Sequence, residues 1–188
     1  MGTMTTCHIT AIRYLTLYPP SLFGKLDRIY PIGVFNILEI FLKPWPEASQ
    51  EAFCIRQQVF IEEQGVPAEM ELDEFDPGAQ HALVYEGNYC IATARLVHLS
   101  PQDAQIGRMA VLQEYRERGV GMALLKRLID LAGSQGISRL VLHSQVSAIP
   151  FYEKVGFVSE GPIYDEAGIP HRNMMLLLPK TTSSFCHP

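Results

Sequence analysis

Residues 106–121 read Ile-Gly-Arg-Met-Ala-Val-Leu-Gln-Glu-Tyr-Arg-Glu-Arg-Gly-Val-Gly, and a leucine-rich stretch follows them. The apolar run at the start predicts a strand, and the glycine-containing loop at 116–121 predicts a turn that opens a helix. A helix N-terminus presents unpaired backbone N–H groups and about half a positive charge, which together favour a phosphate. The stretch therefore predicts a binding site for a cofactor that carries phosphate.

Two common phosphate-binding loops are absent from the sequence. A P-loop requires G-x-x-x-x-G-K-[ST], which does not occur in the chain. The dinucleotide fingerprint G-x-G-x-x-G requires a third glycine, and Leu124 stands in its place after Gly119 and Gly121. What remains is Arg-x-x-Gly-x-Gly, which begins at Arg116 and follows a strand of a predicted antiparallel hairpin.

Composition narrows the class of protein. The 188 residues are 47% hydrophobic, enough for one domain with a real core, expected over 33–179. A net charge of −5 argues against a nucleic-acid partner, and no segment reaches the roughly 18 apolar residues of a membrane span. Four scattered cysteines favour reduced thiols and a cytoplasmic location. Residues 1–32 are expected to form an irregular extension and 180–188 a flexible tail.

The hydrophobic pattern predicts an α/β (α+β) fold: a mixed, mostly antiparallel central sheet of about six or seven strands with helices on both faces. The acidic stretch at 68–80 is expected to be a loop or a short helix. Strands are predicted at 34–42, 81–85, 89–98, 105–112, 138–143, 157–160 and 171–178, and helices at 47–64, 119–135 and 148–155.

Two motifs resemble those of the GNAT superfamily of acyl-CoA-dependent N-acyltransferases. One is the Arg-x-x-Gly-x-Gly loop, and the other is the segment from Gln145 through Phe151-Tyr152 to Gly156-Phe157, which is similar to Asn-x-x-Ala-x-x-Phe-Tyr-x-x-x-Gly-Phe. The segments RQQVFIEEQ at 56–64, ELD at 71–73 and GIPH at 168–171 are similar to ElaA-type members. The resemblance covers about 34–179 and implies the GNAT fold, with acetyl-CoA as co-substrate and no metal.

The resemblance also implies the site. The loop would surround the pyrophosphate of coenzyme A, and the strand at 109–111 would offer backbone groups to the pantetheine arm. Tyr152 is the candidate general acid for the leaving thiolate, because a phenol with a pKa of about 10 keeps its proton at pH 7. The residues expected to bind the cofactor are Met109, Ala110, Val111, Arg116, Arg118, Gly119, Val120, Gly121, Met122, Gln145, Phe151 and Tyr152.

The sequence alone does not decide which residue is the general base or where the acceptor binds. Glu62, Glu63, Glu71 and Asp73 are candidates for an anionic mouth that attracts a cationic amine, and Glu74 and Asp76 extend it; the alternative is a set of solvated loop carboxylates. Glu63 and His171 are candidate bases. His81 and His143 could also titrate near neutrality, although each can equally be structural.

The expected function is transfer of an acetyl group from acetyl-CoA to a small primary amine or a polyamine-like acceptor by direct attack on the thioester. The protein is expected to be a monomer or homodimer. One alternative is a non-catalytic acyl-CoA-binding regulatory module. The other is an acyl-homoserine-lactone synthase, whose Arg…Phe…Glu-x-Asp-x-x-Asp…Arg series is echoed at Arg56, Phe60, Glu71, Asp73, Asp76 and Arg95, although the chain's only tryptophan is Trp45.

Overall fold

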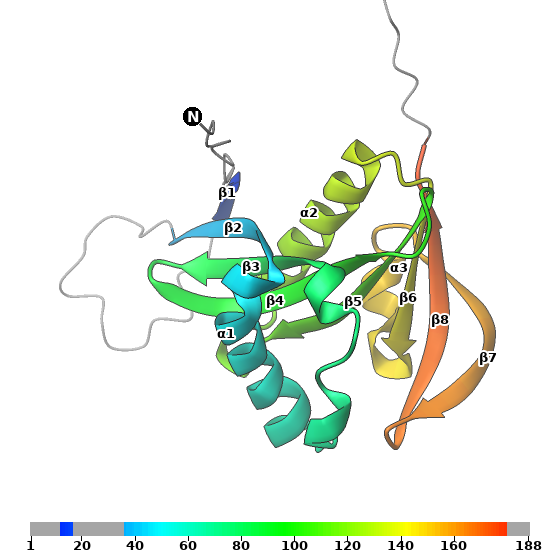
Figure 1. The fold of residues 1–188 in the computed structure, drawn as a ribbon, viewed down its shortest axis with the longest axis horizontal. Helices are drawn as coiled ribbons and strands as arrows, with labels where there is room; N and C mark the ends of the chain where they lie inside the picture. The colour runs from blue at the N-terminus through cyan, green and yellow to red at the C-terminus, as the bar shows by residue number, and fades with distance from the viewer. Residues whose placement is uncertain (1–11, 17–35, 180–188) are drawn as a thin grey trace, which may run out of the picture.

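The computed structural model describes residues 12–16 and 36–179, and these form one eight-stranded sheet flanked by helices (Figure 1). The strand order is β1-β2-β3-β4-β5-β6-β8-β7. The strands are β1 (Ile12–Thr16), β2 (Asn36–Pro44), β3 (Gln80–Glu86), β4 (Tyr89–His98), β5 (Asp103–Val111), β6 (Arg139–Gln145), β7 (Val158–Glu166) and β8 (Ile169–Leu177).

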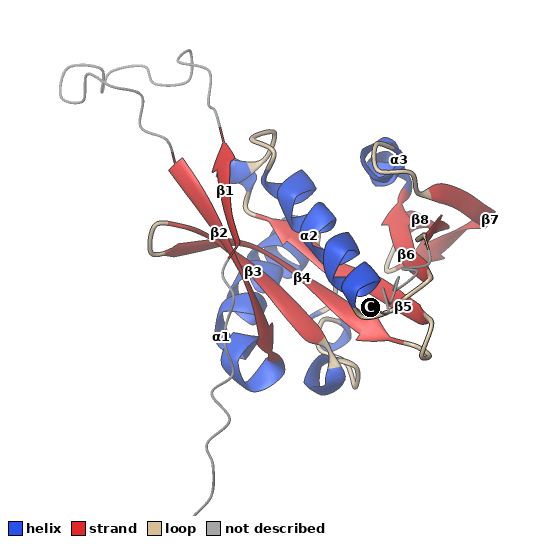
Figure 2. Cartoon of the chain, turned by 90° about the horizontal axis from the view of Figure 1, so that it is seen from above, coloured by secondary structure: helices blue, strands red, loops and turns tan. Residues whose placement is uncertain are grey.

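The helices cover both faces of the sheet, as predicted. α1 (Trp45–Arg56) lies on one face, and α2 (Val120–Ser134) lies on the other (Figure 2). Side chains alternate across a strand, so Leu83 of β3 packs against α1 while its neighbours Ala82 and Val84 join the core under α2. The short α3 (Ile149–Glu153) packs against the same core as α2.

The sheet opens between β5 and β6. These two strands are the one parallel pair among the described strands, and their register covers only 103–105 against 139–141. Beyond that point β5 continues along β4, and β6 continues along β8. The carboxyl ends of β5 and β6, which carry the predicted site residues, are therefore not joined by backbone hydrogen bonds.

A bulge interrupts β5 near its carboxyl end. Thr93 of β4 stands opposite Ala110, whereas Arg95 stands opposite Gly107. Arg108 and Met109 therefore face the single residue between them on β4, and Arg108 has a φ of +50°. A bulge of this kind twists the strand and leaves part of the backbone ladder unpaired. The irregularity falls at the start of the segment expected to meet the pantetheine arm.

The predicted fold class is confirmed, with three local differences. Gln57–Glu63 continues from α1 as a π-helix, and Ile12–Thr16 forms a strand inside the segment for which irregular structure was predicted. β7 runs on past residue 160, where the predicted strand ended, and includes Pro162; a proline is tolerated there because β7 lies at the edge of the sheet. The tail at 180–188 and most of 1–32 lie outside the described residues.

No helix in the described ranges is both long and apolar enough to cross a membrane.

Candidate active site

The predicted phosphate loop leads directly into α2. Gly119 is the N-cap of this helix with a φ of +78°, and no side chain caps the helix. Glu117 is also left-handed, with a φ of +62°. The N–H groups of the first turn have no partner within a helix, and left-handed residues in a turn gather such groups into an anion-binding concavity. The loop thus has the donors and the helix dipole that a pyrophosphate requires.

A pocket of about 610 Å³ lies beside this loop, and we call it the cofactor pocket. Gly121 brings α2 close to its walls, because a Cβ atom there would lie 3.5 Å from Phe151 and 3.6 Å from Val111. Among the predicted cofactor residues, those that line it are Met109, Ala110, Val111, Arg116, Gly119, Gly121, Met122, Phe151 and Tyr152.

Gly119→Ala is expected to raise the Kd for acetyl-CoA about tenfold. A Cβ at Gly119 meets open space, so the cost comes from the left-handed φ, about 1–2 kcal/mol for an alanine, and relief of that strain misaligns the first-turn donors. Isothermal titration calorimetry measures the change. Gly133→Ala, inside the same helix and also with open space, is the matched control and should leave Kd unchanged. Equal Kd values for the two variants would contradict the role of the loop.

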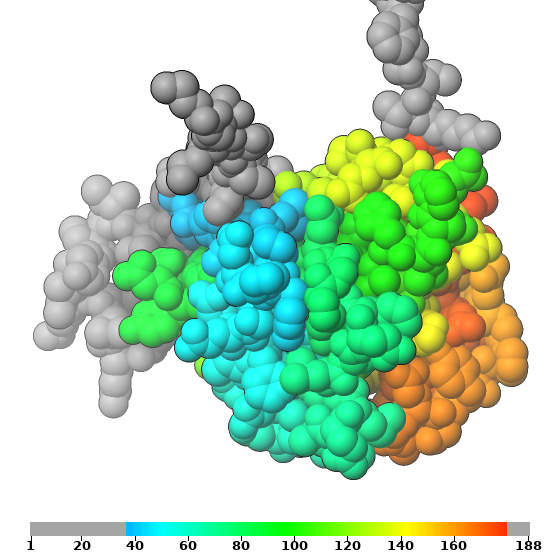
Figure 3. All heavy atoms as spheres, in the orientation of Figure 1, coloured from blue at the N-terminus to red at the C-terminus, as the bar shows by residue number. Residues whose placement is uncertain are grey.

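A second pocket of about 240 Å³ adjoins the first, and we call it the acceptor-side pocket. Its walls come from the segment after α1, the ends of β5 and β6, and the β7–β8 hairpin. The outer surfaces of the first and last of these are seen in Figure 3 as the cyan-green and orange regions. Gln64, Met109, Ala148 and Tyr152 line both pockets. The two cavities therefore meet at Tyr152.

Tyr152 lies at this junction and has a raised pKa. Its hydroxyl lies 3.8 Å from Met109 Sδ, and burial raises the pKa of Tyr152 to about 12. Its ring makes an edge contact with Phe151 at a centroid distance of 5.0 Å. The phenol is therefore protonated at neutral pH and is positioned as a hydrogen-bond donor between the two pockets.

His171 is the predicted base that the structure places in the acceptor-side pocket. Its Nδ1 lies 2.8 Å from the carbonyl oxygen of Ile169. Because a carbonyl only accepts, this contact assigns the hydrogen to Nδ1 and leaves the lone pair on Nε2. The ring stacks with Tyr164 at 6.2 Å. His171 can therefore accept a proton through Nε2.

A family model for the acetyltransferase (GNAT) domain matches residues 45–178. The chain belongs to the GNAT family. It is 38% identical to the uncharacterized N-acetyltransferase YjcF of Bacillus subtilis over 69% of this chain and 92% of that protein. Among solved structures, an acyl-CoA N-acyltransferase from Pseudomonas aeruginosa (25% identity, TM-score 0.66) and Escherichia coli ElaA (25%, 0.67) each align with 73% of this chain and 98% of theirs. The protein is therefore an acyltransferase.

For the alternative of an acyl-homoserine-lactone synthase, the likeness to a solved structure extends to the fold alone. A coenzyme A-dependent acyl-homoserine lactone synthase aligns with 71% of this chain and 80% of its own, at 16% identity and a TM-score of 0.60. The arginines and carboxylates that suggested it lie in the network described next.

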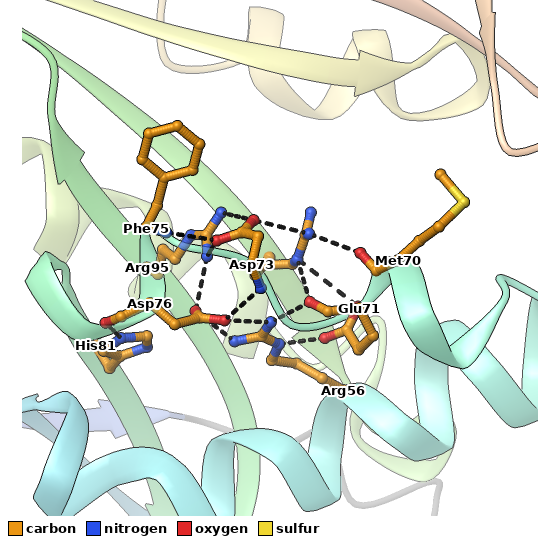
Figure 4. A network of polar contacts seen from close by, with 9 residues as sticks. Arg56, Met70, Glu71, Asp73, Phe75, Asp76, His81 and Arg95 are labelled. Carbon is orange, nitrogen blue, oxygen red and sulfur yellow. Dashed lines mark hydrogen bonds and ion pairs between the residues drawn. The ribbon is translucent and has the colours of Figure 1, made fainter.

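Glu71, Asp73 and Asp76, three of the carboxylates considered for an anionic mouth, are paired with arginines instead (Figure 4). Arg56 binds Glu71 and both oxygens of Asp76, the latter at 2.9 and 3.1 Å. Arg95 binds both oxygens of Asp73 at 2.6 Å and also Asp76 at 2.7 Å. Arg108 completes the set through Asp73 at 3.0 Å. Three guanidinium groups thus balance these three carboxylates, which are not free to attract a cationic amine, whereas Glu62 and Glu74 are exposed.

The network also fixes the charge of Asp76. Burial alone would raise the pKa of this carboxyl, but the hydrogen bonds and charges of Arg56 and Arg95 outweigh burial and hold the pKa at about 2. His81, a candidate from sequence, is buried beside the network with Nε2 3.0 Å from the carbonyl oxygen of Asp76. Its ring packs at a tilt of 41° against Trp45, with a centroid distance of 4.8 Å, and it lines neither pocket, so we interpret it as a structural residue.

The structure argues against Glu63 as a base. Arg116 binds the two oxygens of Glu63 at 2.7 and 2.5 Å, and its Nε donates to the carbonyl oxygen of Val111 at 2.9 Å. The hydrogen bond from Arg116 lowers the pKa of Glu63 and so weakens it as a base. Arg116 therefore ties the phosphate loop to β5 and to the segment after α1.

Four other predicted residues lie apart from the cofactor pocket. Glu62 is exposed and accepts a hydrogen bond from Gln57 at 2.9 Å, and Arg118 lies 5.3 Å over the ring of Tyr115. Val120 is buried in the core, so only its backbone could meet a cofactor. Gln145 lines the acceptor-side pocket instead, where its Nε2 donates to Gln64 at 2.8 Å.

Sequence reasoning gave no role to Gln64, Arg108 and Glu166, all of which line the acceptor-side pocket. Glu166 lies 3.7 Å from Nδ1 of His143, another candidate that lines this pocket. The one signal in the sequence was Arg108 itself, a charged residue within an otherwise apolar strand pattern. Within the described residues, no group of three or more His, Cys, Asp or Glu side chains is placed to hold a metal ion.

Proposed function

We propose that this acyltransferase moves an acetyl group from acetyl-CoA to a primary amine of a small molecule by direct attack on the thioester. The observation that supports it best is the meeting of the two pockets at Met109 and Tyr152. Coenzyme A would occupy the cofactor pocket with its pyrophosphate at the start of α2. The amine would enter from the acceptor-side pocket, so the thioester and the amine would meet beside the tyrosine.

The acceptor must lose a proton before it attacks. An alkylamine has a pKa near 10.4, so only about one molecule in 2,000 is neutral at pH 7. His171 Nε2 would accept the proton of the attacking nitrogen, because its Nδ1 is already committed to Ile169. The nitrogen forms a bond to the carbonyl carbon, and the carbon–sulfur bond breaks.

The leaving sulfur then receives a proton. The hydroxyl of Tyr152 is the donor, and the resulting phenolate is reprotonated by solvent or by the proton held at His171. The products are the N-acetylated amine and coenzyme A with a free thiol. The protons balance: an acceptor that enters as an ammonium ion loses one proton to solvent before attack and a second to His171 during attack, and the leaving thiolate gains one. Acetylation therefore releases one proton to solvent overall.

Two measurements test this function against the regulatory alternative. Calorimetry with acetyl-CoA should show saturable binding, and a thiol-release assay against a panel of primary amines should show turnover with some of them. No heat of binding would refute the assignment of the cofactor pocket. Binding without thiol release from any amine would instead support the non-catalytic module.

A further inference from the structure

We propose that Arg108 forms a subsite for a carboxylate of the acceptor, so that the preferred acceptors are amino acids or closely similar amines that carry a carboxylate. This inference rests on the proposed function and narrows its substrate class. Of the two acceptors expected from the sequence, it narrows the small primary amine and argues against the polyamine-like molecule.

The first support is the place of Arg108 on β5. It precedes Met109, whose sulfur contacts the hydroxyl of Tyr152, and all three residues line the acceptor-side pocket. Consecutive Cα atoms are about 3.8 Å apart, so the side chain of Arg108 begins one residue away from Met109, where transfer would occur. A compact molecule could therefore engage Arg108 while its amine reaches the thioester.

The second support is the way the guanidinium group is held. Nε donates to the carbonyl oxygen of Glu71 at 3.1 Å, and Nη2 donates to Met70 at 3.1 Å and to Asp73 at 3.0 Å. Nη1 makes no hydrogen bond with any of the described residues. The side chain is 24% exposed, against 1% for Arg56 and 8% for Arg95. Arg108 is thus fixed in place with one donor nitrogen open, as a ligand-binding arginine needs to be.

The third support is the charge around Arg108. The carboxylate of Asp76 binds Arg56 and Arg95, and both oxygens of Asp73 bind Arg95. Arg108 shares one oxygen of Asp73 and lies 3.7 Å from Glu71. Burial lowers the pKa of Arg108, the charges of Glu71 and Asp73 oppose this shift, and the charges of Arg95 and Arg56 add to it. The closest contacts of Arg108 with its two carboxylates, 3.0 and 3.7 Å, are longer than those of Arg56 and Arg95, so Arg108 is the arginine of the network that a ligand anion would stabilise most.

The carboxylates of the pocket differ in how free they are to bind a second ammonium group. Glu71 and Glu166 are the carboxylates that line it within the described residues. Glu71 is buried and paired with Arg56, whereas the side chain of Glu166 is 42% exposed and lies 3.7 Å from His143. The cavity of about 240 Å³ is also smaller than the roughly 300–1,000 Å³ of sites that hold drug-sized ligands. A small amine with one negative group fits this environment better than a polyamine.

The test compares matched acceptors: L-phenylalanine, L-methionine and L-glutamine, each with its α-carboxamide and with the amine that lacks the α-carboxyl group. Thiol release gives kcat/KM, and calorimetry in saturating coenzyme A gives binding without turnover. For at least one set, the acid should exceed its amide at least tenfold in kcat/KM and in affinity, in keeping with a charge-assisted hydrogen bond.

Arg108→Asn removes the guanidinium group but keeps a residue that tolerates the left-handed φ. It should lower kcat/KM for the acid 10- to 100-fold, mainly through KM. The kcat/KM for the amide and the KM for acetyl-CoA should each stay within about twofold of the wild-type values. The kcat/KM of Arg108→Lys for the acid should lie between those of the wild type and Arg108→Asn, because lysine retains the charge. Arg139→Gln, an exposed arginine paired with Asp103 outside both pockets, is the control and should change nothing.

The outcomes separate the two proposals. Amides and simple amines used as well as the acids would overturn the carboxylate subsite while leaving the acetyltransferase function standing. Carboxylate-dependent binding that Arg108→Asn abolishes, without thiol release from any amine, would support the subsite and overturn the function. Absence of carboxylate-dependent binding and turnover in all three sets would overturn the subsite.

Discussion

Tyr152→Phe is expected to lower kcat for acetyl transfer about 100-fold, with the KM for acetyl-CoA changed less than threefold. The variant keeps the ring that packs against Phe151 and Phe157 and removes only the hydroxyl that lies 3.8 Å from Met109 Sδ. Loss of a positioned acid typically costs 10²- to 10⁴-fold. Steady-state thiol release at saturating acetyl-CoA measures the change.

The raised pKa of Tyr152 places the expected effect at the lower end of that range. A phenol with a pKa of about 12 is a weak acid toward a thiolate whose pKa is near 8.5, and full transfer is uphill by about 5 kcal/mol. The hydroxyl therefore acts chiefly by a hydrogen bond to the sulfur as negative charge develops there. The proton would move late in the step, when the amine has already given up its own.

Tyr89→Phe is the matched control. Tyr89 lies in the β3–β4 hairpin with 75% of its surface exposed, so removal of its hydroxyl should leave kcat unchanged. A kcat for Tyr152→Phe within threefold of the wild-type value would remove Tyr152 from the mechanism and leave it a packing residue. A large rise in KM for acetyl-CoA would instead assign it to binding.

The parts of the structure that sequence predicted well are those fixed by local patterns. The loop at 116–121 and the Phe151-Tyr152 pair are short motifs, and the apolar stripe of Val120, Leu124, Leu128 and Leu131 repeats at helical spacing; all four stripe residues are buried. These patterns depend on neighbours along the chain, so they predict where a helix begins and which face it buries.

The acidic loop was misjudged for the opposite reason. Its carboxylates look like a solvated anionic surface because acidic residues cluster there, but their partners are distant in sequence. Arg56 lies 15 residues from Glu71, and Arg95 lies 22 from Asp73. Charge sign can be read from sequence, whereas pairing depends on how α1, β4 and β5 converge. For the same reason the sequence did not single out Arg108. Its proposed role depends on a β-bulge and on which of its N–H donors have no partner in the protein.

Arg56→Met is expected to lower the free energy of unfolding by about 3–5 kcal/mol at pH 7. Arg56 is fully buried and binds Glu71 and Asp76, each with a side chain only 2% exposed. Removal of one partner from a buried ion pair leaves uncompensated charges, which is far more costly than the net worth of the pair. Urea denaturation followed by far-ultraviolet circular dichroism measures the loss and avoids the fluorescence of Trp45, whose ring lies 5.7 Å from the guanidinium.

Arg139→Met provides the comparison, because its ion pair with Asp103 is partly exposed. About half of the Arg139 side chain and one-third of the Asp103 side chain are exposed. An exposed pair is worth about 0–1 kcal/mol, so this variant should lose little. Equal losses for the two variants would show that the buried network contributes no more than a surface pair.

The pH dependence distinguishes a lost ion pair from lost packing. In the wild type the folded-state pKa of Asp76 is lowered from 3.8 to about 2, so its contribution of roughly 2 kcal/mol is complete above pH 4 and disappears as pH falls toward 2. In Arg56→Met, buried Asp76 loses one of its two arginines and favours its neutral form, so acid relieves the cost of its buried charge. The difference in stability between the two proteins should therefore shrink steadily from pH 7 to pH 3. A difference that stays constant with pH would attribute the loss to the cavity and packing left by the arginine.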